Sequence, residues 1–199
     1  MFTIKIFNQF FIFIIIITIF ICIFFSPSYI LSNQTIEFIN FIDDGNLLWP
    51  APGYYGINSY FGKRNAPTGG ASTYHKGIDI ASPQGSKLIA VTDGIITFVG
   101  FLGGGGYTIT ITDNNVENGT IKYSYCHCDP NFIVSKGDNV KKGQVIGIVG
   151  PKYVYGVPGN KYHDSKGLPT NGATTGPHLH FGMRINDKYV NPLNYLPSD

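Results

Sequence analysis

The residues best suited to chemistry lie in two histidine-containing stretches of this sequence. In the first, TTGPHLHFG (174–182), His178 and His180 stand two positions apart. Side chains at positions i and i+2 of a strand point to the same face, so both imidazoles should face the same way. In a chain with five histidines, such a pair either decorates a surface or forms part of a site.

The second stretch is YHKGIDIAS (74–82), in which His75 and Asp79 stand four positions apart. Gly77 and its β-branched neighbours argue against a helix. On a straight strand the two Cα atoms would be about 13 Å apart, too far to hold one ion. We therefore expect a bend at Gly77, where glycine tolerates unusual dihedral angles, with His75 before it and Asp79 after it. Both are good Zn²⁺ ligands, and a catalytic zinc site uses three protein ligands plus water.

Seven segments rich in Val, Ile, Thr, Tyr and Phe must position these residues. Gly, Asn, Asp or Pro separate most of them, which is typical of strands joined by turns. No segment after the N-terminal apolar run keeps a helical period beyond two turns. We therefore expect an all-β, mainly antiparallel domain, two-layered or barrel-like. The expected strands are 57–61, 87–91, 94–100, 107–112, 120–126, 144–150 and 178–185.

The N-terminus begins with an apolar run in which residues 10–25 carry no charge. This length falls between that of a secretion signal and the about 20 residues of a membrane span. No small-x-small cleavage site follows clearly. We therefore expect residues 1–31 to be an uncleaved membrane anchor, 32–48 a connector and 49–199 the globular domain.

The charges around the apolar run indicate its orientation. Lys5 is the only basic residue before Lys63, whereas Glu37, Asp43 and Asp44 follow the run. The positive-inside rule then keeps the N-terminus in the cytoplasm and places the domain on the other side of the membrane. The alternative is a cleaved signal peptide and a secreted domain, so both interpretations export it.

The composition limits the partners of the chain. The formal net charge is +2, and no basic cluster stands out. A nucleic-acid partner is therefore not expected. The oligomeric state stays open.

Three histidine-containing motifs follow one another along the chain: His75-x-x-x-Asp79, Tyr125-x-His127 and His178-x-His180. Together they resemble the lysostaphin-type zinc metallopeptidases, which cleave peptide bonds in bacterial peptidoglycan. Other sequence segments are also similar to those of the family, over about residues 50–196. They are SYFGKR (59–64), HKGIDIASPQGS (75–86), VTDGIITFVG (91–100), KGDNVKKGQVIGIVG (136–150), TTGPHLHF (174–181) and VNPLNYL (190–196).

The resemblance implies that His75, Asp79 and His180 bind Zn²⁺ and that His127 and His178 form a catalytic pair beside the metal. Two neutral imidazoles and one carboxylate leave such a site with a net positive charge, which lowers the pKa of bound water. Which catalytic histidine takes the proton and which stabilises the oxyanion stays open. The expected function is a zinc-dependent endopeptidase for the cross-links or stem peptides of peptidoglycan.

The two cysteines beside His127 call for a separate interpretation. If strand alternation continues through YSYCHC, Tyr123, Tyr125 and His127 share one face, and Cys126 and Cys128 take the other. That alternation argues against a Cys-His-Cys metal site. The cysteine Cα atoms would be about 6.6 Å apart, near the upper limit for a disulfide, so we expect buried free thiols.

The sequence also departs from the family. Gly182 stands where the family often has Glu, and Cys128 replaces a usual apolar residue, but neither position is an implied ligand. Segment 151–171 is longer than the usual short turn, and it forms either a wall of the site or a surface loop. Arg64 has two interpretations, an anchor for a substrate carboxylate or a structural ion pair.

Two other functions fit parts of the sequence. One is a catalytically silent cell-wall-binding or hydrolase-activating module on the same fold, but all three implied ligands and both further histidines are present. The other follows from KGDNVKKGQVIGIVG (136–150), which resembles the hairpin of a lipoyl or biotinyl carrier. That segment lacks a Met-Lys-Met-like tip, which argues against a carrier.

Overall fold

A computed structural model describes residues 47–114 and 119–197 of the chain. Within these ranges the chain forms β-strands and two short 3₁₀ helices, without any α-helix. No helix in the described part has the length and apolar character needed to cross a bilayer. The expected anchor (1–31) and most of the expected connector (32–48) lie outside the described residues, so both stay predictions.

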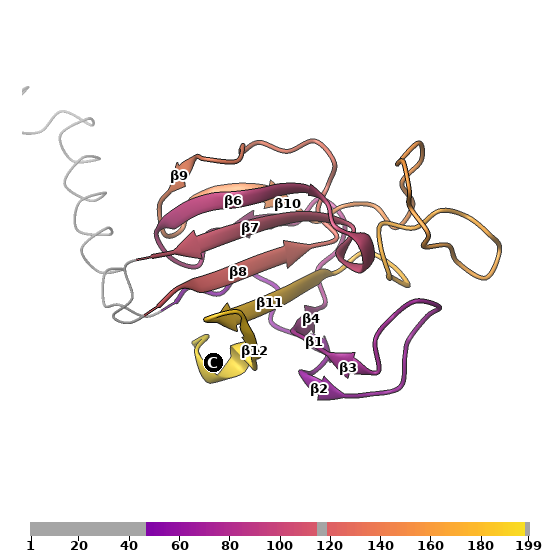
Figure 1. The fold of residues 1–199 in the computed structure, drawn as a ribbon, viewed down its shortest axis with the longest axis horizontal. Helices are drawn as coiled ribbons and strands as arrows, with labels where there is room; N and C mark the ends of the chain where they lie inside the picture. The colour runs from indigo at the N-terminus through magenta and orange to yellow at the C-terminus, as the bar shows by residue number, and fades with distance from the viewer. Residues whose placement is uncertain (1–46, 115–118, 198–199) are drawn as a thin grey trace, which may run out of the picture. The chain divides into compact units, whose positions relative to one another are not determined.

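The largest sheet is antiparallel throughout (Figure 1). Across the described part its order is β1-β4-β11-β8-β7-β6-β9, with β12 beside β11. The long strands form its centre: β6 (Gly94–Phe101), β7 (Tyr107–Asp113), β8 (Ile121–Cys126) and β11 (Leu179–Ile185). The short strands lie towards the two ends of the sheet: β1 (Ile57–Ser59), β4 (Ile78–Ile80), β9 (Asn139–Val140) and β12 (Lys188–Val190).

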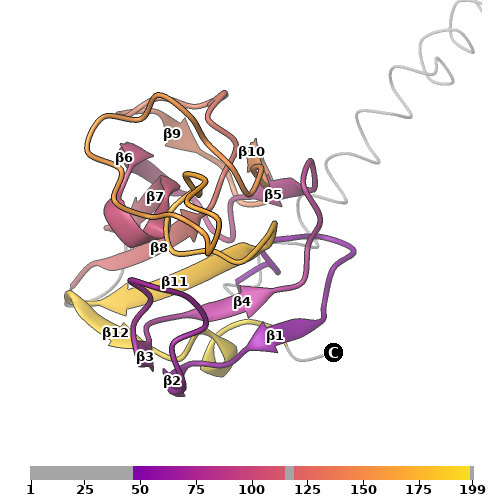
Figure 2. The same ribbon diagram turned by 90° about the vertical axis from the view of Figure 1, so that its right-hand side faces the viewer.

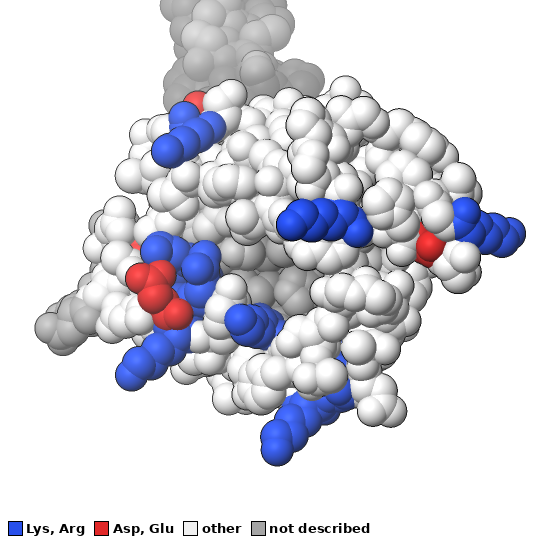
Figure 3. All heavy atoms as spheres, turned by 45° about the vertical axis from the view of Figure 1, so that its right-hand side comes forward, with Lys and Arg blue, Asp and Glu red and all other residues white. Residues whose placement is uncertain are grey.

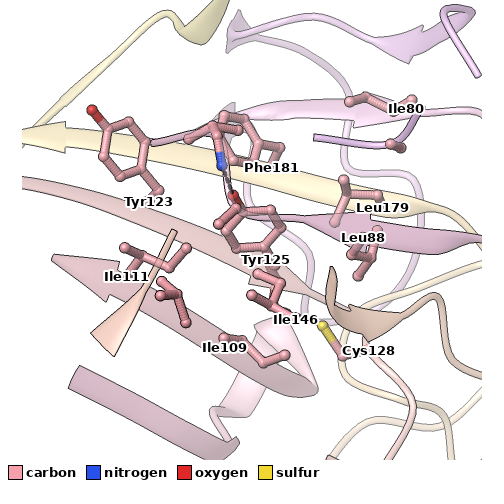
Figure 4. Packing of buried hydrophobic residues seen from close by; sticks show 14 of the residues in the cluster. Ile80, Leu88, Ile109, Ile111, Tyr123, Tyr125, Cys128, Ile146, Leu179 and Phe181 are labelled. Carbon is pink, nitrogen blue, oxygen red and sulfur yellow. Dashed lines mark hydrogen bonds between the residues drawn. The ribbon is translucent and has the colours of Figure 1, made fainter. Parts of the chain in front are cut away.

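A second layer covers one face of the large sheet. It consists of β5 (Lys87–Ile89) paired antiparallel with β10 (Val145–Ile148). Fully buried side chains from both layers meet between them, as Figure 4 shows for Leu88, Ile109, Tyr125 and Ile146. The Tyr125 hydroxyl accepts a hydrogen bond of 3.0 Å from the backbone N–H of Val91. The expected all-β, two-layered architecture is confirmed.

The elements that carry the chemistry lie next to one another. β4 lies beside β11, and β8 lies on the other side of β11, as Figure 2 shows. A small separate sheet pairs β2 (Gly62–Lys63) with β3 (Tyr74–His75), immediately before β4. Two 3₁₀ helices complete the described elements: η1 (Gly103–Gly105), between β6 and β7, and η2 (Pro192–Asn194), after β12.

Each of the seven expected strands overlaps an observed one, and the expected bend between His75 and Asp79 is confirmed. His75 ends β3, Asp79 is the central residue of β4, and the chain bends between them at Lys76 and Gly77. β2, β3, β9 and β12 are not among the expected strands. Each contains only two or three residues, too few to show an alternating pattern in the sequence.

Candidate metal centre

Three side chains from neighbouring strands converge on one point. Asp79 on β4 and His180 on β11 are directly opposite each other in the register of the two strands. His75, at the end of β3, comes in from the bend. Their ligand atoms all lie within 4.8 Å of one another. His75, Asp79 and His180, which the sequence predicts as the ligand set, are therefore brought together.

The distances within this group are those of ligands around a shared cation. Asp79 Oδ1 lies 3.0 Å from His75 Nε2 and 2.8 Å from His180 Nδ1. The two ring nitrogens are 2.9 Å apart. His75 Nδ1 lies 2.9 Å from the carbonyl oxygen of Tyr60, and a carbonyl accepts only from an N–H, so the His75 proton is on Nδ1. The Nε2 lone pair therefore faces the carboxylate, an arrangement that a cation between them stabilises.

Gly77 is the residue that lets the bend approach β11. A Cβ at this position would run into the carbonyl oxygen of Phe181 and would lie 2.9 Å from the ring of His180. The φ angle of Gly77 is not in the left-handed region. The bend is therefore as predicted, but its physical reason is different, because close packing rather than dihedral freedom excludes a side chain here.

Arg64 binds the carboxylate oxygen of Asp79 that does not face the imidazoles of His75 and His180. Its Nη1 donates to Asp79 Oδ2 at 2.9 Å and to the Ser59 hydroxyl at 2.6 Å. Of the two interpretations of Arg64, the structure shows the ion pair. Burial alone would raise the pKa of Asp79, but contacts with the imidazoles of His178, His180 and His75 outweigh it and hold that pKa well below its usual range. Asp79 is therefore a carboxylate at every pH of interest.

His127 lies beside the three ligands, but strand alternation does not place it there. Its φ angle is +59°, a left-handed conformation that ends β8 and turns the side chain. Tyr125 points into the core, whereas Cys126 and His127 both line the cleft at the metal ligands. The expectation that His127 shares a face with Tyr125, and that Cys126 points away from it, is therefore wrong. Both cysteines are buried free thiols, as expected.

His127 and His178 present the same ring nitrogen to the site. His127 Nδ1 donates to the carbonyl oxygen of Asn171 at 2.7 Å, and His178 Nδ1 donates to that of Gly176 at 2.9 Å. In both rings Nε2 is therefore the atom left for chemistry. The two ring centroids are 4.7 Å apart, and His178 Nε2 lies 3.5 Å from Asp79 Oδ1. The predicted pair is thus adjacent to the predicted ligands.

Burial favours the neutral imidazoles of His127 and His180. The pKa of His127 is well below its ordinary value because of burial and the neighbouring His178 and His180. Burial also lowers the pKa of His180, although Asp79 opposes the shift. A neutral imidazole can accept a proton or bind a metal, whereas a protonated one can do neither. At neutral pH these two imidazoles can therefore accept a proton or bind a metal ion.

Asn171 is a residue of the site that sequence reasoning missed. It is fully buried, and its backbone carbonyl holds His127. Its side chain accepts from the backbone N–H of Tyr107 at 2.8 Å and donates to the carbonyl of Cys128 at 2.9 Å. The Asn-Gly dipeptide at 171–172 indicates only a turn, so the sequence contains no local signal for this role.

A cleft of about 400 Å³ opens over the metal ligands. Its floor is β8 and β11, which contribute Ser124, Cys126 and Gly182 beside the histidines. The loop after β2 and the turn around η1 line its sides. No residue of segment 151–171 lines it, although this whole segment is described. Tyr162 of that segment lies against Gly70 and Gly104, which do line the cleft.

An all-β domain that brings His, Asp and His together, beside two further histidines in an open cleft, has the arrangement of a zinc metallopeptidase. Comparison with protein families matches residues 73–163 to peptidase family M23. A curated relative, the DD-carboxypeptidase/endopeptidase Mpg of Neisseria meningitidis, is 37% identical over 141 residues, which are 71% of this chain and 27% of that protein. The chain thus spans about a quarter of the length of this relative.

Solved structures agree with the sequence match. A zinc-containing peptidase from Vibrio cholerae superimposes with a TM-score of 0.55 at 30% identity, over 76% of this chain and 39% of that one. The catalytic domain of lysostaphin from Staphylococcus simulans gives a TM-score of 0.54 at 27% identity, over 71% of this chain and 91% of that one. The chain belongs to peptidase family M23, the lysostaphin-type metallopeptidases.

Proposed function

We propose that this protein is a zinc-dependent endopeptidase that hydrolyses peptide bonds in the cross-links or stem peptides of bacterial peptidoglycan. The observation that carries the proposal is the convergence of His75 Nε2, Asp79 Oδ1 and His180 Nδ1 at 2.8–3.0 Å from one another. Two neutral imidazole nitrogens and one carboxylate oxygen suit Zn²⁺ and leave room for further ligands. Family membership and the names of the relatives support the substrate class.

In this proposal His75, Asp79 and His180 hold the zinc. When bound, the ion would supply a Lewis acid and lower the pKa of water near neutrality. Arg64 positions the carboxylate, since it occupies Oδ2 and leaves Oδ1 facing the two imidazoles. Such outer hydrogen bonds orient ligands and strengthen metal binding.

His127 and His178 are the proposed catalytic residues. Each has its Nδ1 proton held by a carbonyl oxygen and its Nε2 lone pair directed to the cleft. A neutral Nε2 can take a proton from the attacking water and later donate it to the leaving amine, and a protonated one can stabilise an oxyanion. His178 lies closer to the ligand Asp79, whereas His127 is the more buried of the two.

The location of the protein is also a proposal. The apolar run within residues 1–31 supports a membrane anchor that leaves the catalytic domain on the non-cytoplasmic side, or a cleaved signal that secretes it. Peptidoglycan lies on that side, so both locations suit the proposed substrate. Fractionation of cells that express the full chain would distinguish an anchored protein from a secreted one.

The test is to purify the full chain in detergent micelles, measure its zinc content, and digest defined muropeptides with identification of the products by mass. We expect about one zinc per chain, and cleavage that chelator abolishes and added zinc restores. A folded, zinc-loaded protein that leaves every muropeptide intact would favour the catalytically silent module instead. A folded protein that binds no zinc would contradict both the metal centre and the proposed activity.

A further inference from the structure

The cleft over the metal ligands is lined by basic side chains. Among the described residues that line it, Asp79 is the only acid, and Arg64 and the histidines already engage its carboxylate. Lys76 and Arg184 line the same cleft. Figure 3 shows Lys and Arg side chains around a hollow in the face turned forward. A cleft with this balance of charge attracts an anionic ligand.

Arg184 forms no close ion pair with any described residue, although it lines the cleft beside the metal ligands. In the register of β8 and β11 it is opposite Lys122, and like charges in directly opposite positions destabilise a sheet. Asp187 neutralises Lys122, with 2.7 Å between Nζ and Oδ1. Arg184 has no hydrogen bond or close ion pair with any residue in the described part of the chain, although Asp187 lies near enough to interact with its charge. Its donors are therefore available to a ligand.

Tyr189 on β12 brings Arg184 and Lys76 together. Arg184 Cζ lies 5.5 Å from the centroid of the Tyr189 ring, and Lys76 Nζ lies 4.9 Å from it. The ring restricts where both cations can go, which lowers the entropy lost when they bind an anion. A carboxylate at this end of the cleft can accept hydrogen bonds from both side chains.

Gly182 leaves a path open between the metal ligands and Arg184. His180, Gly182 and Arg184 lie on one face of β11, whereas the residues between them are in the core. A Cβ at Gly182 would lie 3.3 Å from the Lys76 carbonyl oxygen and 3.8 Å from His180 Nε2. A long side chain here would therefore lie across the floor between the two positions. With glycine, an extended peptide can pass along the strand.

We propose that Arg184, assisted by Lys76, binds a side-chain carboxylate of the peptide substrate and makes the enzyme select acidic peptides over amidated ones. This inference rests on the proposed peptidase function. His180 and Arg184 are four residues apart on one strand, so their Cα atoms are about 13 Å apart. An extended peptide bound along β11 has the same rise per residue as the strand. The bound carboxylate therefore lies roughly two to four positions from the scissile bond.

The experiment compares matched peptides that contain one scissile sequence. One pair differs only in a side-chain carboxylate or carboxamide three positions from the cleaved bond. A second pair differs only in a free or amidated C-terminus. Their dissociation constants are measured by fluorescence anisotropy on the zinc-loaded full chain with the His178→Ala substitution, which slows turnover. Hydrolysis of the same peptides by the unsubstituted chain is followed separately.

We expect the side-chain acid to bind about ten-fold more tightly than its amide, as hydrogen bonds to charged groups do. Arg184→Gln should reduce this ratio to about two-fold or less. Gly182→Glu should do the same by supplying an internal carboxylate, whereas Gly182→Gln has the same bulk and should retain the preference. Lys87→Met removes a cation on β5, outside the cleft, and should leave the ratio unchanged.

Three outcomes would overturn the inference. These are equal affinity for the side-chain acid and its amide, a ratio that survives Arg184→Gln in a folded, zinc-loaded protein, and a preference confined to the free C-terminus. Selective binding of the acid without hydrolysis of any peptide would support the carboxylate site and contradict the peptidase function. Hydrolysis of the acid and the amide without selective binding would support the peptidase function and contradict the carboxylate site. The two proposals therefore fail separately.

Discussion

The Nδ1 atom of His127 lies 2.7 Å from the backbone carbonyl oxygen of Asn171, 44 positions later in the chain. This single bond sets the tautomer of a buried imidazole and turns its Nε2 towards the metal ligands. Asn171 is itself held on both sides, because its side chain bonds to the backbone of Tyr107 and of Cys128. The orientation of His127 therefore depends on a buried residue that does not itself line the cleft.

Asn171→Ala should destabilise the domain and reduce turnover together. The substitution leaves the N–H of Tyr107 and the carbonyl of Cys128 unpaired in the interior, at a cost of about 2–4 kcal/mol in the free energy of unfolding. Thermal unfolding and muropeptide hydrolysis measure the two effects. Asn131→Ala is the matched control, since Asn131 bonds only within an exposed turn. Equal behaviour of the two variants would contradict the role given to Asn171.

The two histidines of the HLH motif should respond differently to removal. His180→Ala removes a proposed ligand and should abolish most zinc binding. His178→Ala should retain most of the zinc and lose about 10²–10⁴-fold in turnover, because its proposed role is proton transfer. Zinc content and hydrolysis are measured on the same preparations. Equal loss of zinc in both variants would show that the two roles are assigned wrongly.

Arg64→Gln should weaken zinc binding without touching a ligand. Asp79 Oδ2 then loses its 2.9 Å bond to the guanidinium, and the carboxylate can rotate away from the imidazoles. Loss of such an outer contact weakens metal affinity about 10–100-fold. Competition with a chelator of known affinity measures the change. Arg64→Lys keeps the charge and should recover part of the affinity, so an unchanged affinity in Arg64→Gln would contradict the positioning role.

Much of this arrangement can be read from the sequence because its rules are local. Alternation along a strand predicts that His178 and His180 face the same way, and the four-residue spacing of His75 and Asp79 requires the observed bend. The position of His127 depends instead on a left-handed φ angle of +59°, which few residue types other than glycine adopt. No alternating pattern reveals such a break in advance.

Relationships between distant segments are the part that the sequence does not contain. Asn171 reaches His127, and Lys76 and Arg184 share the ring of Tyr189, only because of the register between strands. A shift of one residue in that register would move every side chain to the other face. Composition and spacing along the chain do not determine the register, so these contacts became visible only in three dimensions.

Acidification should destabilise the fold through His127. Burial holds the pKa of His127 well below its ordinary value, whereas in the unfolded chain the pKa of this imidazole is about 6.5. At pH values below the unfolded-state pKa of His127, the unfolded chain binds a proton that the native state does not. The free energy of unfolding therefore falls as the pH falls. Thermal unfolding between pH 8 and pH 5 measures the slope.

The comparison for this pH effect is His127→Asn, because asparagine tolerates the left-handed backbone at this position. Its melting temperature should fall less steeply on acidification than that of the unsubstituted chain. His163→Asn changes an exposed histidine outside the cleft and should leave the slope as it is. Parallel pH curves for the His127 variant and the unsubstituted chain would contradict the prediction.

The last prediction concerns segment 151–171, for which the structure indicates an indirect role. None of its residues lines the cleft, but Tyr162 supports Gly70 and Gly104 on either side of it. A bridge between Tyr153 and Thr170 closes the base of the segment. Residues 154–169 can therefore be replaced by a short Gly-Ser turn while Asn171 stays in place.

This replacement should leave zinc content and fold intact, because the ligands and the buried contacts of Asn171 remain. Cleavage of intact peptidoglycan should drop, since the loop after β2 and the turn at η1 lose the side chain that holds them apart. Hydrolysis of a short peptide, which needs little of the walls, should suffer less. Tyr162→Ala should reproduce most of the effect, and Tyr155→Ala, at a tyrosine that is 68% exposed, should reproduce none of it. Unchanged rates on both substrates after the replacement would make the segment dispensable for catalysis.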